Sequence, residues 1–251
     1  MSTTTLPGTS RPLRKWLAVG LPLGLIALLL LAEPTRLDFA ISDLFYTPGA
    51  GFVGKHSFFL EDILHDRAKE AVILIAVLAI IGLLVSCVYR PWSALRRPLG
   101  MVVLALVLCS SFVSPVKTLT GVHCPWDLSR YGGKEIYTPL LSERAPTLKP
   151  GRCWPGGHAT SGFALFALYF GLHDRKPRLA RGLLCFALAL GTVFSVGRTM
   201  QGAHFISHNL WTALFDWMIC LTCYRLILYR APQVAVQPAA SGAALSGEAS
   251  R

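Results

Sequence analysis

The chain has 251 residues, of which 53% are hydrophobic and 15% are charged, and a formal net charge of +11 at pH 7. This length and composition leave two classes open, one large soluble domain or a bundle of membrane spans. The hydrophobic residues are gathered in long runs, which excludes the first class and predicts an integral membrane protein.

Six apolar runs follow one another along the chain, at residues 16–32, 71–89, 99–116, 159–172, 182–196 and 205–228. Four of them have or approach the roughly 20 helical residues that cross a hydrocarbon core. The runs at 159–172 and 182–196 are shorter, and we expect each to extend into its polar flanks. The prediction is an all-α, polytopic membrane bundle of about six transmembrane helices, at residues 16–230, between a tail at 1–15 and a disordered tail at 231–251.

The first run follows Arg11, Arg14 and Lys15, as the core of a secretory signal peptide would. It is longer than a typical signal core, and residues 32–35, Ala-Glu-Pro-Thr, lack a small-x-small cleavage pattern. We therefore expect a retained helix.

Basic residues cluster before the first run, after the second and after the fourth, and a six-span topology places these three clusters on one side. The positive-inside rule makes that side the cytoplasm, so both termini are expected to be cytoplasmic. Residues 33–70 hold seven acidic and four basic side chains and belong outside. Because this topology accounts for much of the net charge, no nucleic-acid partner is predicted.

Three polar clusters stand where apolar runs begin or end, and all three fall on the predicted outer face. They are Lys117 to Pro125, the Pro-Gly-Gly-His sequence at 155–158, and Arg198 to His208. Cationic side chains are costly near a bilayer, so an anionic substrate explains them better than anchoring at the headgroups does. Residues 117–157 hold six basic and three acidic side chains, and an outer loop this basic is expected to meet phosphates.

Hydrolysis of a phosphate ester without a metal needs a nucleophile, cations that hold the phosphoryl oxygens, and an acid for the leaving oxygen. Arg198 and His204 can place a guanidinium and an imidazole around one phosphoryl group. Gly156 and Gly157 permit close backbone approach and leave amides free at a helix start beside His158. A site without metal or cofactor is the prediction. The chain lacks a dinucleotide fingerprint and a phosphate-binding loop with Lys-Ser/Thr.

These clusters together resemble the signature of the type 2 phosphatidic acid phosphatase superfamily, membrane lipid phosphatases related to vanadium haloperoxidases. That signature reads KxxxxxxRP, then PSGH, then SRxxxxxHxxxD. The positions that match in order and spacing are Lys117, Pro125, Pro155, Gly157, His158, Arg198 and His204. The resemblance implies a six-helix bundle with its site at the outer mouth. It also implies that His204 forms a phosphohistidine, that His158 protonates the leaving group, and that Lys117 and Arg198 bind phosphoryl oxygens.

Four positions depart from the signature: Cys124 replaces Arg, Gly156 and Gly197 replace Ser, and His208 replaces Asp. The last departure matters most, because that carboxylate would orient the nucleophilic imidazole and stabilise its charge. Three explanations stay open. His208 takes the role through a ring flip or a bridging water, another carboxylate such as Asp127 takes it, or turnover is slow.

The arginine of the signature that Cys124 replaces has two candidate substitutes in the same loop, Arg130 and Arg152, and the sequence leaves both open.

Of seven cysteines, Cys124 and Cys153 alone lie outside the predicted spans, each beside a motif. An oxidising compartment permits a disulfide between them, and two unrelated buried thiols are the alternative. No metal site is predicted, because the cysteines lack ligand spacing.

The leading interpretation is a lipid-phosphate phosphatase that acts on a phosphomonoester or diphosphate at the periplasmic face of a bacterial inner membrane. The lipid partners considered are polyprenyl diphosphate, lipid A phosphate, phosphatidylglycerophosphate and phosphatidic acid. A lipid-to-lipid phosphotransferase is a close alternative, since a phosphohistidine can be discharged by a lipid acceptor. A non-catalytic binding or transport relative is disfavoured because the charged clusters gather at one face rather than at mid-span.

Overall fold

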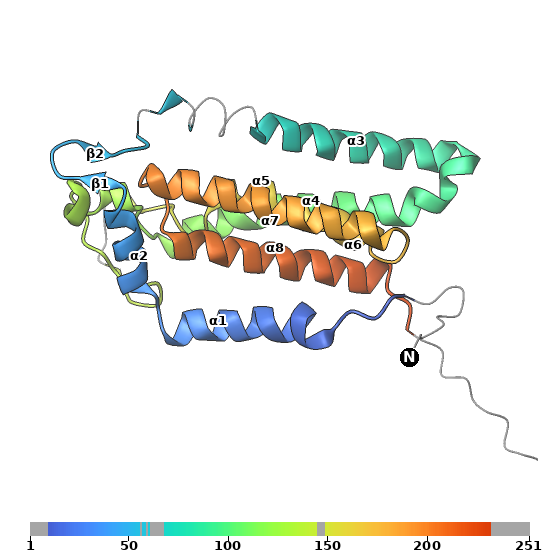
Figure 1. Cartoon of the computed structure of the whole chain (residues 1–251), viewed down its shortest axis with the longest axis horizontal. Coiled ribbons are helices and arrows are strands. Elements are labelled where there is room, and N and C mark those ends of the chain that lie inside the picture. Colours follow the sequence, from blue (N-terminus) through green and yellow to red (C-terminus); the bar gives the residue numbers. More distant parts are fainter. Residues whose placement is uncertain (1–9, 56, 59, 61–67, 145–148, 232–251) are drawn as a thin grey trace, which may run out of the picture.

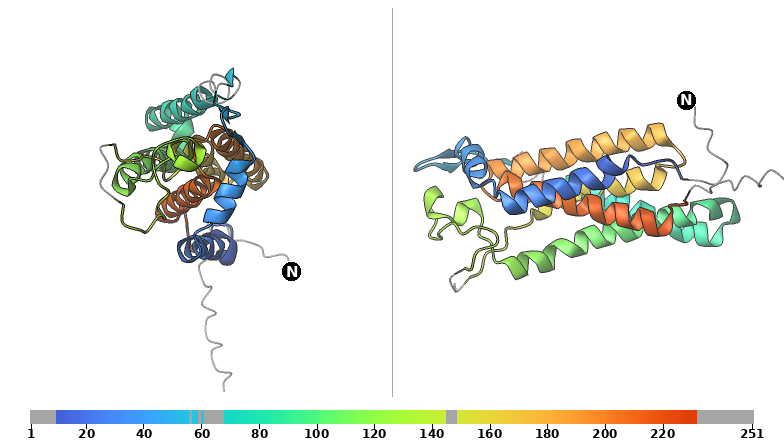
Figure 2. Two further views of the ribbon diagram at one scale, coloured as in Figure 1. Left: turned by 90° about the vertical axis from the view of Figure 1, so that its left-hand side faces the viewer. Right: turned by 90° about the horizontal axis from the view of Figure 1, so that it is seen from below.

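The computed structural model describes residues 10–55, 57–58, 60, 68–144 and 149–231. The tail at 231–251, which the sequence predicts to be disordered, lies outside this part of the chain apart from residue 231. The described residues form the all-α membrane bundle predicted from the sequence, with one short two-stranded sheet as the exception. Long helices lie side by side along the molecule, as Figures 1 and 2 show.

The helices follow one another in a simple order. The first half of the chain contains α1 (Leu21–Leu31), α2 (Thr35–Asp43), the antiparallel strands β1 (Tyr46–Thr47) and β2 (Gly51–Phe52), α3 (Ala68–Val88) and α4 (Arg96–Thr120). The second half contains α5 (Gly157–Phe163), α6 (Phe166–Leu172), α7 (Pro177–Met200) and α8 (Ile206–Ile227). A π-helical turn at Trp16–Gly20 precedes α1, and short 3-10 turns lie at Arg90–Leu95, Pro125–Asp127 and Ser129–Tyr131.

Within the described residues, four helices are long and apolar enough to cross a membrane: α3, α4, α7 and α8. Residues Trp16–Leu31, which comprise the π-helical turn and α1, make a fifth span if they are counted together with α2. The chain bends by 89° between these two parts. This number is smaller than the six spans expected, because the run at 159–172 folds as two helices of seven residues, α5 and α6, instead of one long helix.

The crossing of α5 and α7 explains how two short helices fit inside the bundle. Gly162 and Gly191 let the two backbones approach so closely that a Cβ on Gly162 would lie 2.4 Å from the Gly191 nitrogen. The Phe163 ring covers Gly191 in the same way. Small residues at such crossings are typical of membrane bundles, where close van der Waals packing holds helices together. The buried core around them includes Met101, Phe166 and Tyr224.

The surface of the outer helices is apolar. Leu74, Leu78 and Leu84 on α3 are all more than half exposed, as side chains that face lipid would be. A soluble protein rarely exposes a continuous apolar surface of this kind.

One end of the bundle is closed by α2, the two strands and the loop that follows α4. Aromatic rings of Phe39, Phe52, Tyr131 and Phe205 pack there. The carboxylate of Asp38 accepts hydrogen bonds from the amide and the hydroxyl of Ser207, at 3.0 and 2.5 Å, in the first turn of α8. A carboxylate at a helix start stabilises unpaired amides and the positive end of the helix dipole, so this end cap also fixes the start of α8.

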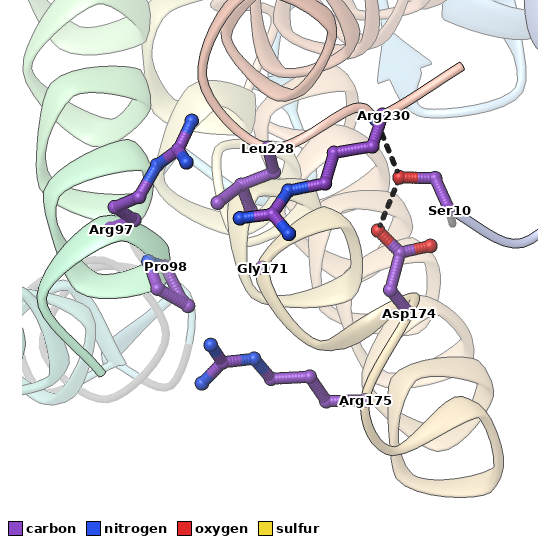
Figure 3. Close-up of a pocket in the computed structure, with 8 residues that line it drawn as sticks. All are labelled: Ser10, Arg97, Pro98, Gly171, Asp174, Arg175, Leu228 and Arg230. Atoms are coloured by element: carbon purple, nitrogen blue, oxygen red, sulfur yellow. Dashed lines mark hydrogen bonds between the residues drawn. The ribbon is translucent and has the colours of Figure 1, made fainter. Parts of the chain in front are cut away.

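The opposite end carries the basic loops. Arg97, Arg175 and Arg230 surround a pocket of about 300 Å³, in which Ser10 donates to Asp174 at 3.0 Å (Figure 3). Arg97 donates to the carbonyl of Ile227 at 2.5 Å, and Arg175 donates to the carbonyl of Ala94 at 2.7 Å. These bonds use the arginines to cap the last carbonyls of helical segments. The pocket is therefore a junction that ties the helix ends together.

Candidate active site

The three polar clusters of the sequence meet at the end of the bundle opposite the arginine junction. Lys117 lies in the last turn of α4 and Arg198 in the last turn of α7. His158 is the second residue of α5, and His204 lies in the connection that enters α8. Because α4 and α7 end where α5 and α8 begin, three chain segments far apart in sequence, the end of α4, the start of α5 and the α7–α8 connection, present these side chains to one another.

Two glycines shape the floor of this site. A Cβ on Gly157 would lie 3.0 Å from the Nζ atom of Lys117, and a Cβ on Gly156 would lie 2.1 Å from Oδ1 of Asn209. The expectation that both amides are free is wrong for Gly156, whose N–H donates to the carbonyl of His208 at 3.0 Å. The amides of Gly157 and His158 open α5, where no intrahelical partner exists for them.

His204 is the most deeply buried member of the cluster, with 3% of its surface exposed. Its ring centroid lies 6.4 Å from that of His158. Burial first, and then the nearby Lys117, His208 and Arg198 side chains, hold the pKa of the His204 imidazole well below its ordinary value of 6.5. A neutral imidazole at pH 7 has a lone pair with which to attack phosphorus.

Arg198 is oriented by two neighbours that the sequence analysis did not identify as functional. Its Nη1 atom donates to Oε1 of Gln201 at 2.8 Å, and its guanidinium carbon lies 5.9 Å from the centre of the Trp126 ring. The amide of Trp126 donates to the carbonyl of Gly202 at 3.0 Å, which ties the loop after α4 to the loop before α8. Gln201 and Trp126 thus keep the guanidinium at the site.

The ring of His208 is not in hydrogen-bond contact with His204 and lines a different cavity. Its ring centroid is 6.3 Å from that of His204, and its ring packs edge-on against Phe205 at 5.3 Å. It lines a separate small cavity together with Glu33 and Trp211. The Nδ1 atom of His204 instead lies 3.2 Å from Sγ of Cys153, a contact that no sequence signal pointed to.

Of the three auxiliary residues predicted from the sequence, Asp127, Arg130 and Arg152, two have structural contacts away from His204 and one lies near the site. The carboxylate of Asp127 accepts from the amide of Cys124 at 3.2 Å and so closes the 3-10 turn. Arg130 forms an ion pair of 2.6 Å with Asp43 of α2 at the exposed rim. Arg152 is exposed and close enough for its charge to act on Lys117. Of the two arginines considered as replacements for the motif Arg, Arg152 is the one near the site.

Cys124 and Cys153 are joined by a disulfide, with Cα atoms 5.1 Å apart and a sequence separation of 29. The amide of Cys153 donates to the carbonyl of Val122 at 2.9 Å, so the chain just after α4 and the chain just before α5 lie side by side here. The sulfurs and a ring nitrogen of His204 lie within 4.8 Å of one another, an arrangement that could hold a metal ion. A disulfide supplies no thiolate ligand, so such a site requires reduction first.

A cavity of about 810 Å³ opens beside the site between α3, α4 and α5. Its walls include apolar side chains of Val72, Ile73, Leu106 and Val107. Lys117, Gly157 and His158 also line it. Five serine and threonine residues line it as well, so the cavity joins a mainly apolar compartment to the cationic cluster.

The family model of the PAP2 superfamily matches residues 98–232. Comparison with curated proteins and with solved structures finds no match. The matched segment is more than half of the chain and contains all three polar clusters. The chain belongs to the PAP2 superfamily, as its motifs indicated.

Proposed function

We propose that this protein is a membrane lipid-phosphate phosphatase that hydrolyses a lipid phosphomonoester or diphosphate through a phosphohistidine on His204. Membership in the PAP2 superfamily supports a phosphatase-type function. The lipid substrate is supported by one observation above all, the cavity of about 810 Å³ whose apolar walls end at Lys117 and His158. An amphiphile with a phosphate at one end fits such a compartment, because its chain replaces exposed apolar surface while its phosphate meets the cations.

The chemistry divides into two transfers. In the first, a ring nitrogen of His204 attacks phosphorus while His158 gives its proton to the leaving oxygen, so that the lipid alcohol or lipid monophosphate departs. In the second, His158 takes a proton from water, the water oxygen attacks the phosphohistidine, and inorganic phosphate leaves. Lys117 and Arg198 hold the phosphoryl oxygens and stabilise their charge in both steps.

The site is proposed to face the periplasm of a bacterial inner membrane. Arg97, Arg175 and Arg230 stand at the other end of the bundle, where the positive-inside rule places the cytoplasm. Substrates would then be lipids whose phosphate is presented at the outer leaflet: polyprenyl diphosphate, lipid A phosphate, phosphatidylglycerophosphate or phosphatidic acid.

A panel of these lipids, assayed in detergent with wild type and His204→Ala, tests the proposal. We expect phosphate release from at least one lipid by wild type, none by the variant, and weak activity toward a short soluble phosphate such as glycerol phosphate. Transfer of labelled phosphate to an acceptor lipid, without free phosphate, would identify a phosphotransferase instead. Lipid flux in liposomes without any phosphate chemistry would contradict both.

A further inference from the structure

The proposed nucleophile needs a partner for its second ring nitrogen, and position 208 does not supply the carboxylate of the family signature. What lies beside Nδ1 of His204 is the sulfur of Cys153, at 3.2 Å. Both residues are buried, Cys153 completely. His208 lines a different cavity, with its ring centroid 6.3 Å from that of His204. The sulfur thus occupies the place where an orienting group would act.

The disulfide determines which atom carries the hydrogen in this contact. A disulfide sulfur has lone pairs but no hydrogen, so it can only accept. The hydrogen bond therefore requires the proton of the imidazole to be on Nδ1. A neutral imidazole has one N–H, which leaves Nε2 with its lone pair, and Nε2 is then the nitrogen that can attack phosphorus. In serine hydrolases, a partner at Nδ1 fixes the tautomer and ring orientation of histidine in the same way.

We propose that Cys153 is the positioning residue of the nucleophile: its sulfur accepts the Nδ1 hydrogen of His204 and so presents Nε2 to the phosphate. This inference rests on the phosphohistidine mechanism proposed above. The sulfur adds no full negative charge, unlike a carboxylate, so it orients the imidazole more than it stabilises an imidazolium.

The role belongs to the sulfur of Cys153 and not to the disulfide as such. Sγ also lies 2.8 Å from the carbonyl oxygen of Ala203. After reduction the Cys153 thiol can donate its hydrogen to that carbonyl and still accept from Nδ1 of His204. Cys124 has no comparable contact with His204, and its share in the arrangement is the bond to Cys153.

Two single variants separate these contributions, because both lack the disulfide and only one lacks the sulfur at Nδ1. Cys124→Ala keeps the Cys153 thiol, and Cys153→Ala removes it. We expect kcat of Cys153→Ala to be about 10-fold or more below that of Cys124→Ala, since loss of a group that orients a functional histidine typically costs 10- to 100-fold. KM should be similar in both, because neither variant removes a group that holds the phosphate.

Three further readouts distinguish positioning from a purely structural role. In protein labelled with 15N-histidine, the His204 signal should report a proton on Nδ1 in wild type and in Cys124→Ala, but a mixture of tautomers in Cys153→Ala. Cys153→Ser in the Cys124→Ala background should recover part of kcat, because a hydroxyl oxygen can accept the same hydrogen. Melting temperatures measured in parallel identify the temperatures at which every variant is folded. Rates are compared only at those temperatures.

Reduction of the wild type provides a test without mutation. A dithiol reductant transfers two electrons and two protons, so that Cys124 and Cys153 become thiols and the reductant closes to its own disulfide. We expect the reduced wild type to behave as Cys124→Ala does. A chelator is present in every arm, because the freed sulfurs and His204 lie within 4.8 Å of one another and could bind zinc.

Equal kcat in Cys124→Ala and Cys153→Ala would overturn the proposal, whether both were low or both normal. An unchanged tautomer in Cys153→Ala would overturn it as well. The parallel His204→Ala assay separates this failure from that of the proposed function. If His204→Ala is inactive while the two cysteine variants agree, only the role of Cys153 is wrong. If His204→Ala is as active as wild type, the phosphohistidine mechanism itself is wrong.

Discussion

At the scale of single residues, the site depends on a neutral imidazole held among cations. His204 is buried close to His158, and the charges of Lys117 and Arg198 act on it. The same cations that are proposed to hold the phosphate therefore oppose protonation of the proposed nucleophile. This arrangement leads to three predictions, which concern catalytic histidines, pH and metal ions.

His204→Ala and His158→Ala should lose activity without loss of folding. Removal of a nucleophile or of a proton donor costs at least about 100-fold. His158→Ala should lose less with a lipid diphosphate, whose leaving group needs less protonation than an alkoxide. Phosphate release with matched mono- and diphosphate lipids measures this difference, and retention of more than about a tenth of the rate by His204→Ala contradicts the mechanism.

The pH dependence follows from the lowered pKa of His204. The folded protein resists protonation of this imidazole, whereas the unfolded chain takes the proton near the ordinary value of 6.5. The neutral form persists in the folded state below pH 6.5, so the acid limb of kcat/KM that belongs to His204 should lie below that value. For the same reason, the contribution of His204 to the free energy of unfolding is present above pH 6.5 and is lost as pH falls below it. An acid limb above pH 6.5 would contradict this assignment.

Metal chelation should leave activity unchanged. The proposed site uses Lys117 and Arg198 where many phosphatases use magnesium, so hydrolysis should proceed in EDTA. Vanadate, which mimics the pentacoordinate transition state of phosphoryl transfer, should inhibit competitively. Complete loss of activity in EDTA, with recovery on adding magnesium, would show that a metal ion stabilises the phosphoryl oxygens in place of Lys117 and Arg198.

At the scale of elements, close helix crossings determine where the motifs stand. The segment with His158 is held against α7 through Gly162 and Gly191, and against α8 through the bond from Gly156 to His208 and the bond from Thr212 to the Gly156 carbonyl at 2.8 Å. The start of α5 is thus bonded to α8, and its last turn packs against α7. The α5–α7 crossing leaves no space for a side chain at Gly162 or Gly191, so a substitution there tests the packing.

Gly191→Ala should destabilise the protein and Gly182→Ala should not. Both glycines lie in α7, but a Cβ at 191 would meet the Phe163 ring at 2.3 Å, whereas a Cβ at 182 meets nothing within 4 Å. Overpacking of this kind typically costs about 1–3 kcal/mol. At 182 the gain in helix propensity is about 1 kcal/mol or less. Thermal melting in one detergent compares the two, and equal melting temperatures would show that the α5 and α7 crossing is loose.

At the scale of the whole molecule, charge separates the two ends of the bundle. One end holds the candidate site beside a cap of aromatic residues, and the other holds the arginine junction around Arg97, Arg175 and Arg230. The positive-inside rule predicts that a bundle with these ends keeps the arginine junction in the cytoplasm.

A reporter fused to the C-terminus should therefore report the cytoplasm. Alkaline phosphatase, which needs an oxidising compartment to fold, should be inactive there and active when fused after residue 143 in the loop beyond α4. The opposite pattern would place the site on the cytoplasmic side, where the Cys124–Cys153 disulfide would not persist.

The fold class, the family and the residues of the three polar clusters could be predicted from the primary structure. The apolar runs predicted an all-α membrane bundle, and that class is confirmed; the motifs around Lys117, His158 and Arg198 predicted the family, which is also confirmed. These features depend on composition and on short spacings, which a chain carries before it folds. The number of spans was less predictable, because the length of an apolar run does not reveal that the run at 159–172 folds as two short helices, α5 and α6.

Tertiary structure alone decided which side chains meet. Arg130 lies in the predicted outer loop but pairs with Asp43, 87 residues away, whereas Arg152 stays near Lys117. His208 occupies a motif position, yet its ring faces another cavity, and the partner of His204 is Cys153, 51 residues earlier. Such contacts depend on how α4, α5 and α8 converge and on how the loop between them is closed. A hydrogen bond needs two atoms within about 3.5 Å, and no local pattern specifies that distance between distant parts of a chain.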